Sequence, residues 1–223
     1  MIAGNWKMFD GPDPVALREA LGDLPHVVAP PYVHLRACVD AGLTTFAQNV
    51  HWEEEGAFTG EISAPMLTAL GIQGAIVGHS ERRQYFGETD LGVARRAHAA
   101  LQAGLQVIAC VGETAEQRDA GDTEVVLRIQ VEAVRDLCGT HDGLVIAYEP
   151  VWAIGTGKTA TPELAEQAHA FIKSLLDVPV LYGGSVKPDN AAELLARPSV
   201  DGALVGGASL DIDSFVSLCR TGS

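Results

Sequence analysis

The chain contains few positive charges compared with negative ones. Lys and Arg total 15 against 29 Asp and Glu, so the formal net charge at pH 7 is −14. A surface this acidic repels nucleic acid and anionic membranes, and we therefore expect neither as a partner. An anionic ligand would need a local positive site that acts against the overall charge.

Long apolar runs and closely spaced cysteines are also missing. No apolar run approaches the roughly 20 residues of a transmembrane helix, and the N-terminus lacks the basic and apolar regions of a signal peptide. The four cysteines are far apart and form no CxxC pair, so neither a metal site nor a disulfide framework is expected. Free thiols are typical of a reducing compartment, which predicts a cytoplasmic protein.

Short apolar runs recur along the whole chain and are nearly all apolar rather than alternating, which is typical of a parallel sheet covered on both faces. We predict strands at Ile2–Asn5, His26–Ala29, Thr44–Ala47, Ala75–Val77, Gln106–Val111, Val145–Tyr148, Val180–Tyr182 and Ala203–Val205. Helices are expected between them, among them Asp13–Leu21, Asp90–Ala103, Thr123–Leu137 and Pro162–Leu176.

Eight such units in 223 residues give about 28 residues each, which suits a compact βα repeat. The count favours an α/β fold closed into a (β/α)8 barrel, although an open doubly wound sheet remains an alternative. No linker or change of composition divides the chain, so residues 1–223 are predicted to form a single domain. At 223 residues the chain is shorter than the roughly 250 typical of this fold, and the stretch between Lys7 and the second strand is compressed by comparison, which predicts a shortened outer helical layer.

Two glycine pairs follow the last two predicted strands, where such barrels often bind phosphate. Gly183-Gly184-Ser185 follows the seventh strand and Gly206-Gly207 follows the eighth. Glycine lets backbone N–H groups approach an anion closely, and a following helix N-terminus adds positive potential. One pair alone is explained equally well by a turn, but the two together predict a phosphate site.

Acid–base candidates follow the fourth and sixth strands. His79 precedes Ser80-Glu81, which reads as a helix start, and a helix N-terminus disfavours the charged imidazole. A neutral His opposite the Glu149 carboxylate suits proton abstraction next to a carbonyl. The structural alternatives are a satisfied core histidine and a salt bridge at a strand end.

The remaining candidates are one cation and two loops. Lys7 and Asn5 follow the first strand and supply a charge and a neutral donor, although each alone would be an ordinary surface residue. Residues 150–160 read as a lid, and their Gly-Lys-Thr sequence lacks the glycine that a nucleotide-binding loop requires. The loop 48–61 exposes Phe58 and is predicted to contact another subunit.

Eight segments resemble those of the triosephosphate isomerase family, in order from residue 4 to residue 210. They are Gly4-Asn5-Trp6-Lys7-Met8, Ala47-Gln48-Asn49, Gly56-Ala57-Phe58-Thr59-Gly60-Glu61, Val77-Gly78-His79-Ser80-Glu81-Arg82-Arg83, Ala109-Cys110-Val111-Gly112-Glu113, the stretch 147–157 beginning Ala147-Tyr148-Glu149-Pro150, Tyr182-Gly183-Gly184-Ser185-Val186 and Val205-Gly206-Gly207-Ala208-Ser209-Leu210. The resemblance implies a TIM barrel that interconverts dihydroxyacetone phosphate and glyceraldehyde 3-phosphate without cofactor or metal.

The same resemblance assigns the catalytic roles. Glu149 would be the base that moves a proton between C1 and C2, and His79 would polarise the carbonyl and stabilise the enediolate. Lys7 would offset the negative charge of the substrate, Asn5 would orient its oxygens and Glu81 would support Lys7.

The resemblance also implies a phosphate site and a homodimer. Gly155, Gly206 and Gly207 would bind phosphate through backbone N–H groups, with Ser185 added, and Thr59 would reach the active site of a second copy. Two alternatives stay open, namely another sugar-phosphate isomerase and a non-catalytic phosphate-binding barrel that serves as a scaffold.

Overall fold

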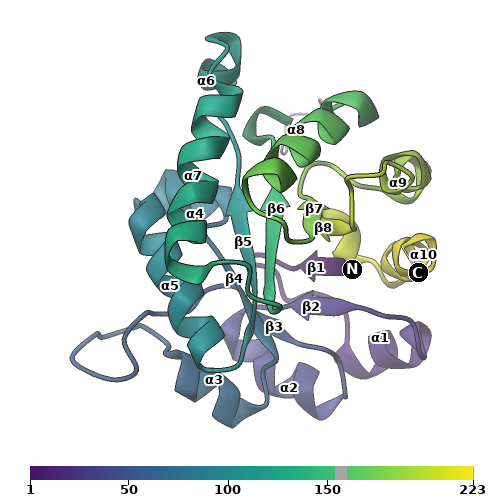
Figure 1. The fold of residues 1–223 in the computed structure, drawn as a ribbon. Helices are drawn as coiled ribbons and strands as arrows, with labels where there is room; N and C mark the ends of the chain where they lie inside the picture. The colour runs from purple at the N-terminus through teal and green to yellow at the C-terminus, as the bar shows by residue number, and fades with distance from the viewer. Residues whose placement is uncertain (154–159, 223) are drawn as a thin grey trace.

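The computed structural model describes residues 1–153 and 160–222, and within them eight parallel strands form one sheet (Figure 1). The strands are β1 (Ile2–Asn5), β2 (Val27–Ala29), β3 (Phe46–Ala47), β4 (Gly74–Val77), β5 (Gln106–Val111), β6 (Leu144–Tyr148), β7 (Val180–Tyr182) and β8 (Ala203–Val205). Each lies within two residues of its predicted position. Their order in the sheet is β2-β1-β8-β7-β6-β5-β4-β3.

The two edge strands of this order meet and close the sheet into a barrel. The Val28 amide donates a hydrogen bond to the Thr44 carbonyl at 2.8 Å, and Val28 forms a parallel bridge with Thr45. Both partners lie directly before β3. The contact decides between the two predicted architectures, and the fold is a (β/α)8 TIM barrel.

Helices surround the sheet, as Figure 1 shows. They are α1 (Pro14–Leu21), α2 (Leu35–Asp40), α3 (Ala64–Leu70), α4 (Ser80–Phe86), α5 (Asp90–Gln102), α6 (Ala115–Asp119), α7 (Thr123–Cys138), α8 (Pro162–Leu175), α9 (Pro188–Leu195) and α10 (Ile212–Thr221), with short 3-10 turns at Tyr32–His34, Val151–Ala153 and Gly207–Leu210. Helices α1, α2 and α3 have 8, 6 and 7 residues, against 16 in α7. The outer helical layer is therefore built from short helices in the N-terminal part of the chain. No helix among the described residues has the length and apolar character needed to cross a membrane.

The ends of the helices follow from local capping chemistry. The Thr161 side chain accepts from the Leu164 amide at 3.3 Å, and Pro162 occupies the first turn of α8, where its missing N–H costs nothing. The His79 side chain caps α4 in a similar way. This cap matters for the chemistry of the site described below.

The core has two layers, because successive side chains of a strand point to opposite faces of the sheet. One layer packs between the strands and the helices. The other lies inside the barrel and consists of buried side chains from all eight described strands, namely Ala3, Val27, Ala29, Phe46, Ile76, Ile108, Cys110, Val145, Ala147, Leu181 and Leu204. The same alternation carries Asn5 and Glu149 to the inner face at the barrel mouth, two residues beyond Ala3 and Ala147.

Candidate active site

A cavity of about 840 Å³ opens at the C-terminal ends of the strands. It is lined by every described residue that the sequence assigns to catalysis or substrate binding, namely Asn5, Lys7, His79, Glu81, Glu149, Ser185, Gly206 and Gly207. Gly155 and most of the predicted lid fall within residues 154–159, outside the described residues. Phe58 and Thr59 do not line this cavity.

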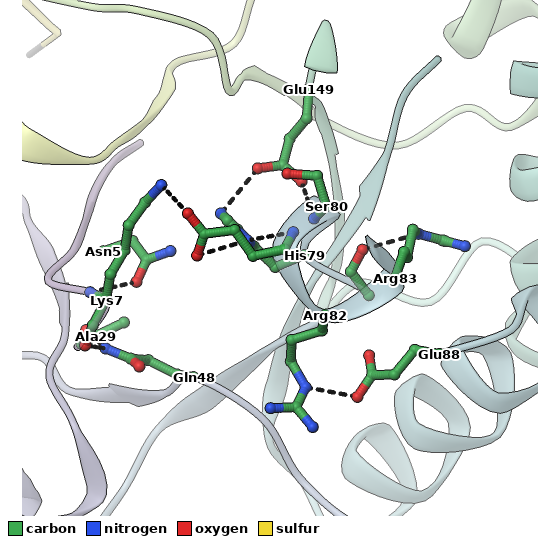
Figure 2. Close-up of polar contacts among 12 residues, drawn as sticks. Asn5, Lys7, Ala29, Gln48, His79, Ser80, Arg82, Arg83, Glu88 and Glu149 are labelled. Carbon is green, nitrogen blue, oxygen red and sulfur yellow. Dashed lines mark hydrogen bonds and ion pairs between the residues drawn. The ribbon is translucent and has the colours of Figure 1, made fainter. Parts of the chain in front are cut away.

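Glu149 lines the cavity, and the residue is only 2% exposed. One oxygen, Oε1, lies 3.0 Å from His79 Nε2, and the other, Oε2, accepts the backbone N–H of Ser80 at 2.8 Å (Figure 2). Ser80 is the first residue of α4, so the carboxylate binds at a helix N-terminus, which favours negative charge.

Burial alone would raise the pKa of Glu149. The charge and hydrogen bond of His79, the Ser80 N–H and the charge of Lys7 outweigh burial and hold the pKa of this carboxyl below its ordinary value. Glu149 is therefore an ionised carboxylate at neutral pH, as a general base must be.

His79 is held by contacts at both ring nitrogens, with the Glu149 carboxylate on one side and the Glu81 backbone on the other. Its Nδ1 accepts the backbone N–H of Glu81 at 3.3 Å, so the neutral ring carries its proton on Nε2, facing Glu149. Burial lowers the pKa of His79, but the Glu149 carboxylate and its hydrogen bond outweigh burial and raise that pKa above its ordinary value. From the sequence, the N-terminus of the following helix is expected to keep His79 neutral. In the structure, the Glu149 carboxylate has a stronger influence and moves the pKa of His79 in the opposite direction.

Lys7 has φ = 53°, and it is the one non-glycine with positive φ in residues 1–153 and 160–222. Its amide donates to Asn5 Oδ1 at 3.0 Å, and its Nζ pairs with Glu81 Oε1 at 2.5 Å (Figure 2). Gln48 Nε2 donates to the carbonyls of Lys7 at 2.7 Å and Ala29 at 2.8 Å. These contacts hold the lysine in a strained backbone conformation with its ammonium group beside the cavity.

Gln48 is a residue of the site that was not assigned a role from the sequence. It follows β3 directly, Asn5 ends β1, and His79 lies two residues beyond the end of β4. The rule that polar residues at strand ends face the barrel mouth would have found it. Gln48 does not line the cavity itself, and it acts on the site by fixing the backbone of Lys7.

Glycine is required for different reasons in the two pairs, Gly183-Gly184 and Gly206-Gly207. A Cβ on Gly183 would lie 2.8 Å from Glu149 Cγ, and one on Gly184 would lie 2.3 Å from Tyr182 Oη, so close packing accounts for both. Apart from its chain neighbours, no atom of the described residues lies within 4 Å of the position of a Cβ on Gly207, where a short 3-10 turn begins. Gly207 therefore stands at an open edge of the cavity, where a backbone N–H is accessible to an anion.

The two arginines that follow His79 in helix α4 make structural contacts. Arg83 forms an ion pair with Asp90 at 2.5 Å and donates to the Gly78 and Cys110 carbonyls at 2.9 and 3.1 Å. Arg82 pairs with the buried Glu88 at 2.6 Å. Neither lines the active-site cavity; Arg83 fixes α4 to β5, and Arg82 fixes α4 to the segment before α5.

Comparison with known proteins agrees with this geometry. The family model described as "Triosephosphate isomerase" matches residues 1–222. Proteins named triosephosphate isomerase from Solibacter usitatus and Geobacter metallireducens are 48% and 50% identical to the chain, over 98% and 96% of it and 97% and 95% of their own lengths. One from Halorhodospira halophila is 50% identical over 98% of this chain and 96% of its own. The chain belongs to the triosephosphate isomerase family.

Proposed function

We propose that this chain interconverts dihydroxyacetone phosphate and D-glyceraldehyde 3-phosphate through an enediolate. The observation that carries the proposal is the buried, ionised carboxylate of Glu149 placed 3.0 Å from His79 Nε2, in a cavity that Lys7 also lines. A base, a hydrogen-bond donor and a cation in one cavity are the groups that a proton transfer beside a carbonyl requires. A scaffold protein has no need for this arrangement.

Glu149 is the proposed base. It takes a proton from C1 of dihydroxyacetone phosphate, the C–H electron pair forms the C1–C2 double bond, and the carbonyl electron pair moves onto O2. The proton on O1 then passes to O2, the protonated carboxyl returns its proton to C2, and the electron pair left on O1 forms the C1–O1 double bond of the aldehyde. To reach carbon, the carboxylate must give up its contacts with Ser80 N at 2.8 Å and His79 Nε2 at 3.0 Å.

His79 is the proposed electrophile, and its Nε2–H donates to the developing oxyanion. The carboxylate of Glu149 is what raises the pKa of His79 against burial. When Glu149 turns to the substrate and takes up a proton, this influence weakens, while the Glu81 N–H on Nδ1 still opposes protonation of that nitrogen. The ring is then a neutral donor when the oxyanion forms.

Lys7 offsets the charge of the substrate, with Asn5 orienting its oxygens and Glu81 holding the lysine. The ion pair of 2.5 Å between Lys7 and Glu81 supports this assignment. Ser185, Gly206 and Gly207 are the proposed phosphate contacts, and all three line the cavity beside Lys7. We propose Gly155 as a fourth phosphate contact because of its sequence motif alone, since it lies outside the described residues.

We further propose a homodimer formed through the loop 48–61, which projects from the barrel as the blue segment before α3 in Figure 1. Phe58 is 44% exposed near its tip, and Met8 and Phe9 beside β1 are 93% and 58% exposed. Apolar side chains this exposed are costly in water, and a second copy would cover them. In this arrangement Thr59 reaches the partner's active site.

We also propose that residues 1–223 act as a single domain and that the protein works in the cytoplasm. The eight described strands share one sheet, and the inner core cluster draws on all of them. The four cysteines are free thiols, which a reducing compartment preserves.

The test is a coupled assay of glyceraldehyde 3-phosphate isomerisation with the wild type and Glu149→Gln, with mass measured by light scattering on the same samples. We expect fast turnover by a wild-type dimer and its loss in the variant, with the dimer unchanged. A folded wild-type dimer without turnover would overturn the isomerase proposal and favour the scaffold. An active wild-type monomer would overturn the proposed role of the loop 48–61.

A further inference from the structure

The active-site cavity carries more negative than positive side chains. Of its lining residues within the described part of the chain, two are cationic and four are carboxylates, namely Lys7, Lys187, Glu81, Glu149, Asp189 and Asp211. A phosphate monoester carries a charge of about −1.5 to −2 near pH 7. The substrate therefore approaches an acidic rim on a protein with a net charge of −14.

One of the two cations is already committed to a carboxylate. Lys7 pairs with Glu81 at 2.5 Å, and this contact cancels much of its field outside the cavity. Lys187 is exposed and forms no ion pair with any residue that the structure describes. Lys173, by comparison, pairs with Asp201 at 2.8 Å. Lys187 therefore supplies the uncommitted positive charge among the described residues of the rim.

The position of Lys187 is fixed by its own backbone. It follows Ser185 by two residues and caps α9, where its amide donates to Asn190 Oδ1 at 2.8 Å. Asn190 Nδ2 also donates to the Ser185 carbonyl at 3.1 Å, so one amide side chain ties both residues together. Hydrogen bonds thus fix the backbone of Lys187 close to that of Ser185, and both residues line the cavity.

We propose that Lys187 is the capture residue for the phosphate dianion of the substrate. This proposal rests on the proposed isomerase function. Lys187 takes no part in proton transfer. It raises the rate at which an anionic substrate enters the cavity. It also raises the preference of the enzyme for phosphorylated over uncharged sugars. A local cation at the mouth of a cleft speeds association even where the net charge is repulsive. Where the kcat/KM of an isomerase nears the diffusion limit, as it does for the best of them, capture governs kcat/KM.

The experiment compares the wild type, Lys187→Gln and the matched control Arg95→Gln. Arg95 is exposed on α5, forms no ion pair among the described residues and does not line the cavity, so its variant removes the same charge elsewhere. We measure kcat and KM for glyceraldehyde 3-phosphate from low to high ionic strength, and inhibition by inorganic phosphate. The slow isomerisation of unphosphorylated D-glyceraldehyde is followed with the same three proteins.

For Lys187→Gln at low salt we expect about a threefold loss in kcat/KM and weaker phosphate inhibition, with kcat unchanged. The loss in kcat/KM should disappear when added salt shortens the screening length to a few ångström. Lys187→Gln and the wild type should isomerise unphosphorylated D-glyceraldehyde at the same rate. Equal kcat/KM for Lys187→Gln and the wild type would overturn the proposal, as would an equal loss in Arg95→Gln or a loss that persists in high salt. A wild type without isomerase activity would instead overturn the proposed function.

Discussion

Replacing Gln48 by Ala tests whether the conformation of Lys7 is held from outside the cavity. The substitution removes the hydrogen bonds from Nε2 to the Lys7 carbonyl at 2.7 Å and to the Ala29 carbonyl at 2.8 Å. The Ala29 carbonyl keeps a second donor, the Trp6 amide at 3.0 Å. The carbonyl of Lys7 loses its hydrogen bond to Gln48. The substitution therefore mainly affects Lys7, whose backbone has the unfavourable φ of 53°.

Two hydrogen bonds at roughly 1 kcal/mol each predict a loss of about 2 kcal/mol in the free energy of unfolding. For a chain of this size that loss lowers Tm by about 4–8 °C. The left-handed conformation costs Lys7 roughly 1–2 kcal/mol, so without Gln48 the residue relaxes and its ammonium group leaves its position. If the same 2 kcal/mol is lost from substrate binding, kcat/KM falls by about thirtyfold.

We expect most of this loss in KM, because the role proposed for Lys7 is to attract the substrate and the transition state alike. The matched control is Gln73→Ala, since Gln73 Oε1 accepts the Thr45 amide at 2.8 Å at the opposite end of the barrel. It should lower Tm without changing either kinetic constant. The assays are thermal unfolding and steady-state kinetics. A kcat/KM for Gln48→Ala within twofold of the wild type, or an equal kinetic loss in Gln73→Ala, would refute the reasoning.

Three further predictions concern the base, the histidine and the loop. Glu149→Asp should lower kcat far more than it raises KM, by about 10²-fold or more, because it withdraws the base without removing phosphate contacts; an unchanged kcat in steady-state assays would contradict its role. Because the pKa of Glu149 is lowered in the folded state, this group stabilises the fold above its ordinary pKa of about 4.3. Because the pKa of His79 is raised, that group stabilises the fold below its ordinary pKa of about 6.5, so the pair contributes most to stability between these two pH values. The difference in Tm between the wild type and His79→Asn should therefore be larger at pH 5.5 than at pH 8.5, and calorimetry showing the opposite order would exclude a charged pair. Phe58→Ser should weaken self-association in light scattering at low protein concentration, whereas an unaltered dimer would remove Phe58 from the interface.

The local pattern of the sequence was enough to locate the strands and most helices. The nearly continuous apolar run Val145–Tyr148 predicted a buried strand, and the strand found, β6, begins one residue earlier. Helix ends also agreed within a residue or two, because capping residues such as Thr161 act on neighbours in the chain. The period of two along a strand likewise places Glu149 on the same face as Ala147.

The candidate site was also visible as a set of polar residues at strand ends. Asn5, His79 and Glu149 could be selected from the sequence because each stands at or just past the end of an apolar run, at the edge where parallel strands finish. Gln48 also directly follows a strand, but its role could not be predicted, because its contact with Lys7 joins residues 41 positions apart. No local pattern shows which backbone carbonyls its side chain contacts.

The sequence by itself determined the strands, the order of the motifs and the identity of the chemical groups, because these depend on residues that are neighbours in the chain. Only the tertiary structure decided the closure of the barrel through Val28 and Thr45, the close packing that requires Gly183, and the direction in which the pKa of His79 moves. Each depends on distances between residues far apart in the chain. Glu149 lies 69 positions from Ser80, yet its carboxylate lies 2.8 Å from that amide, and at such distances charge and burial outweigh local propensity.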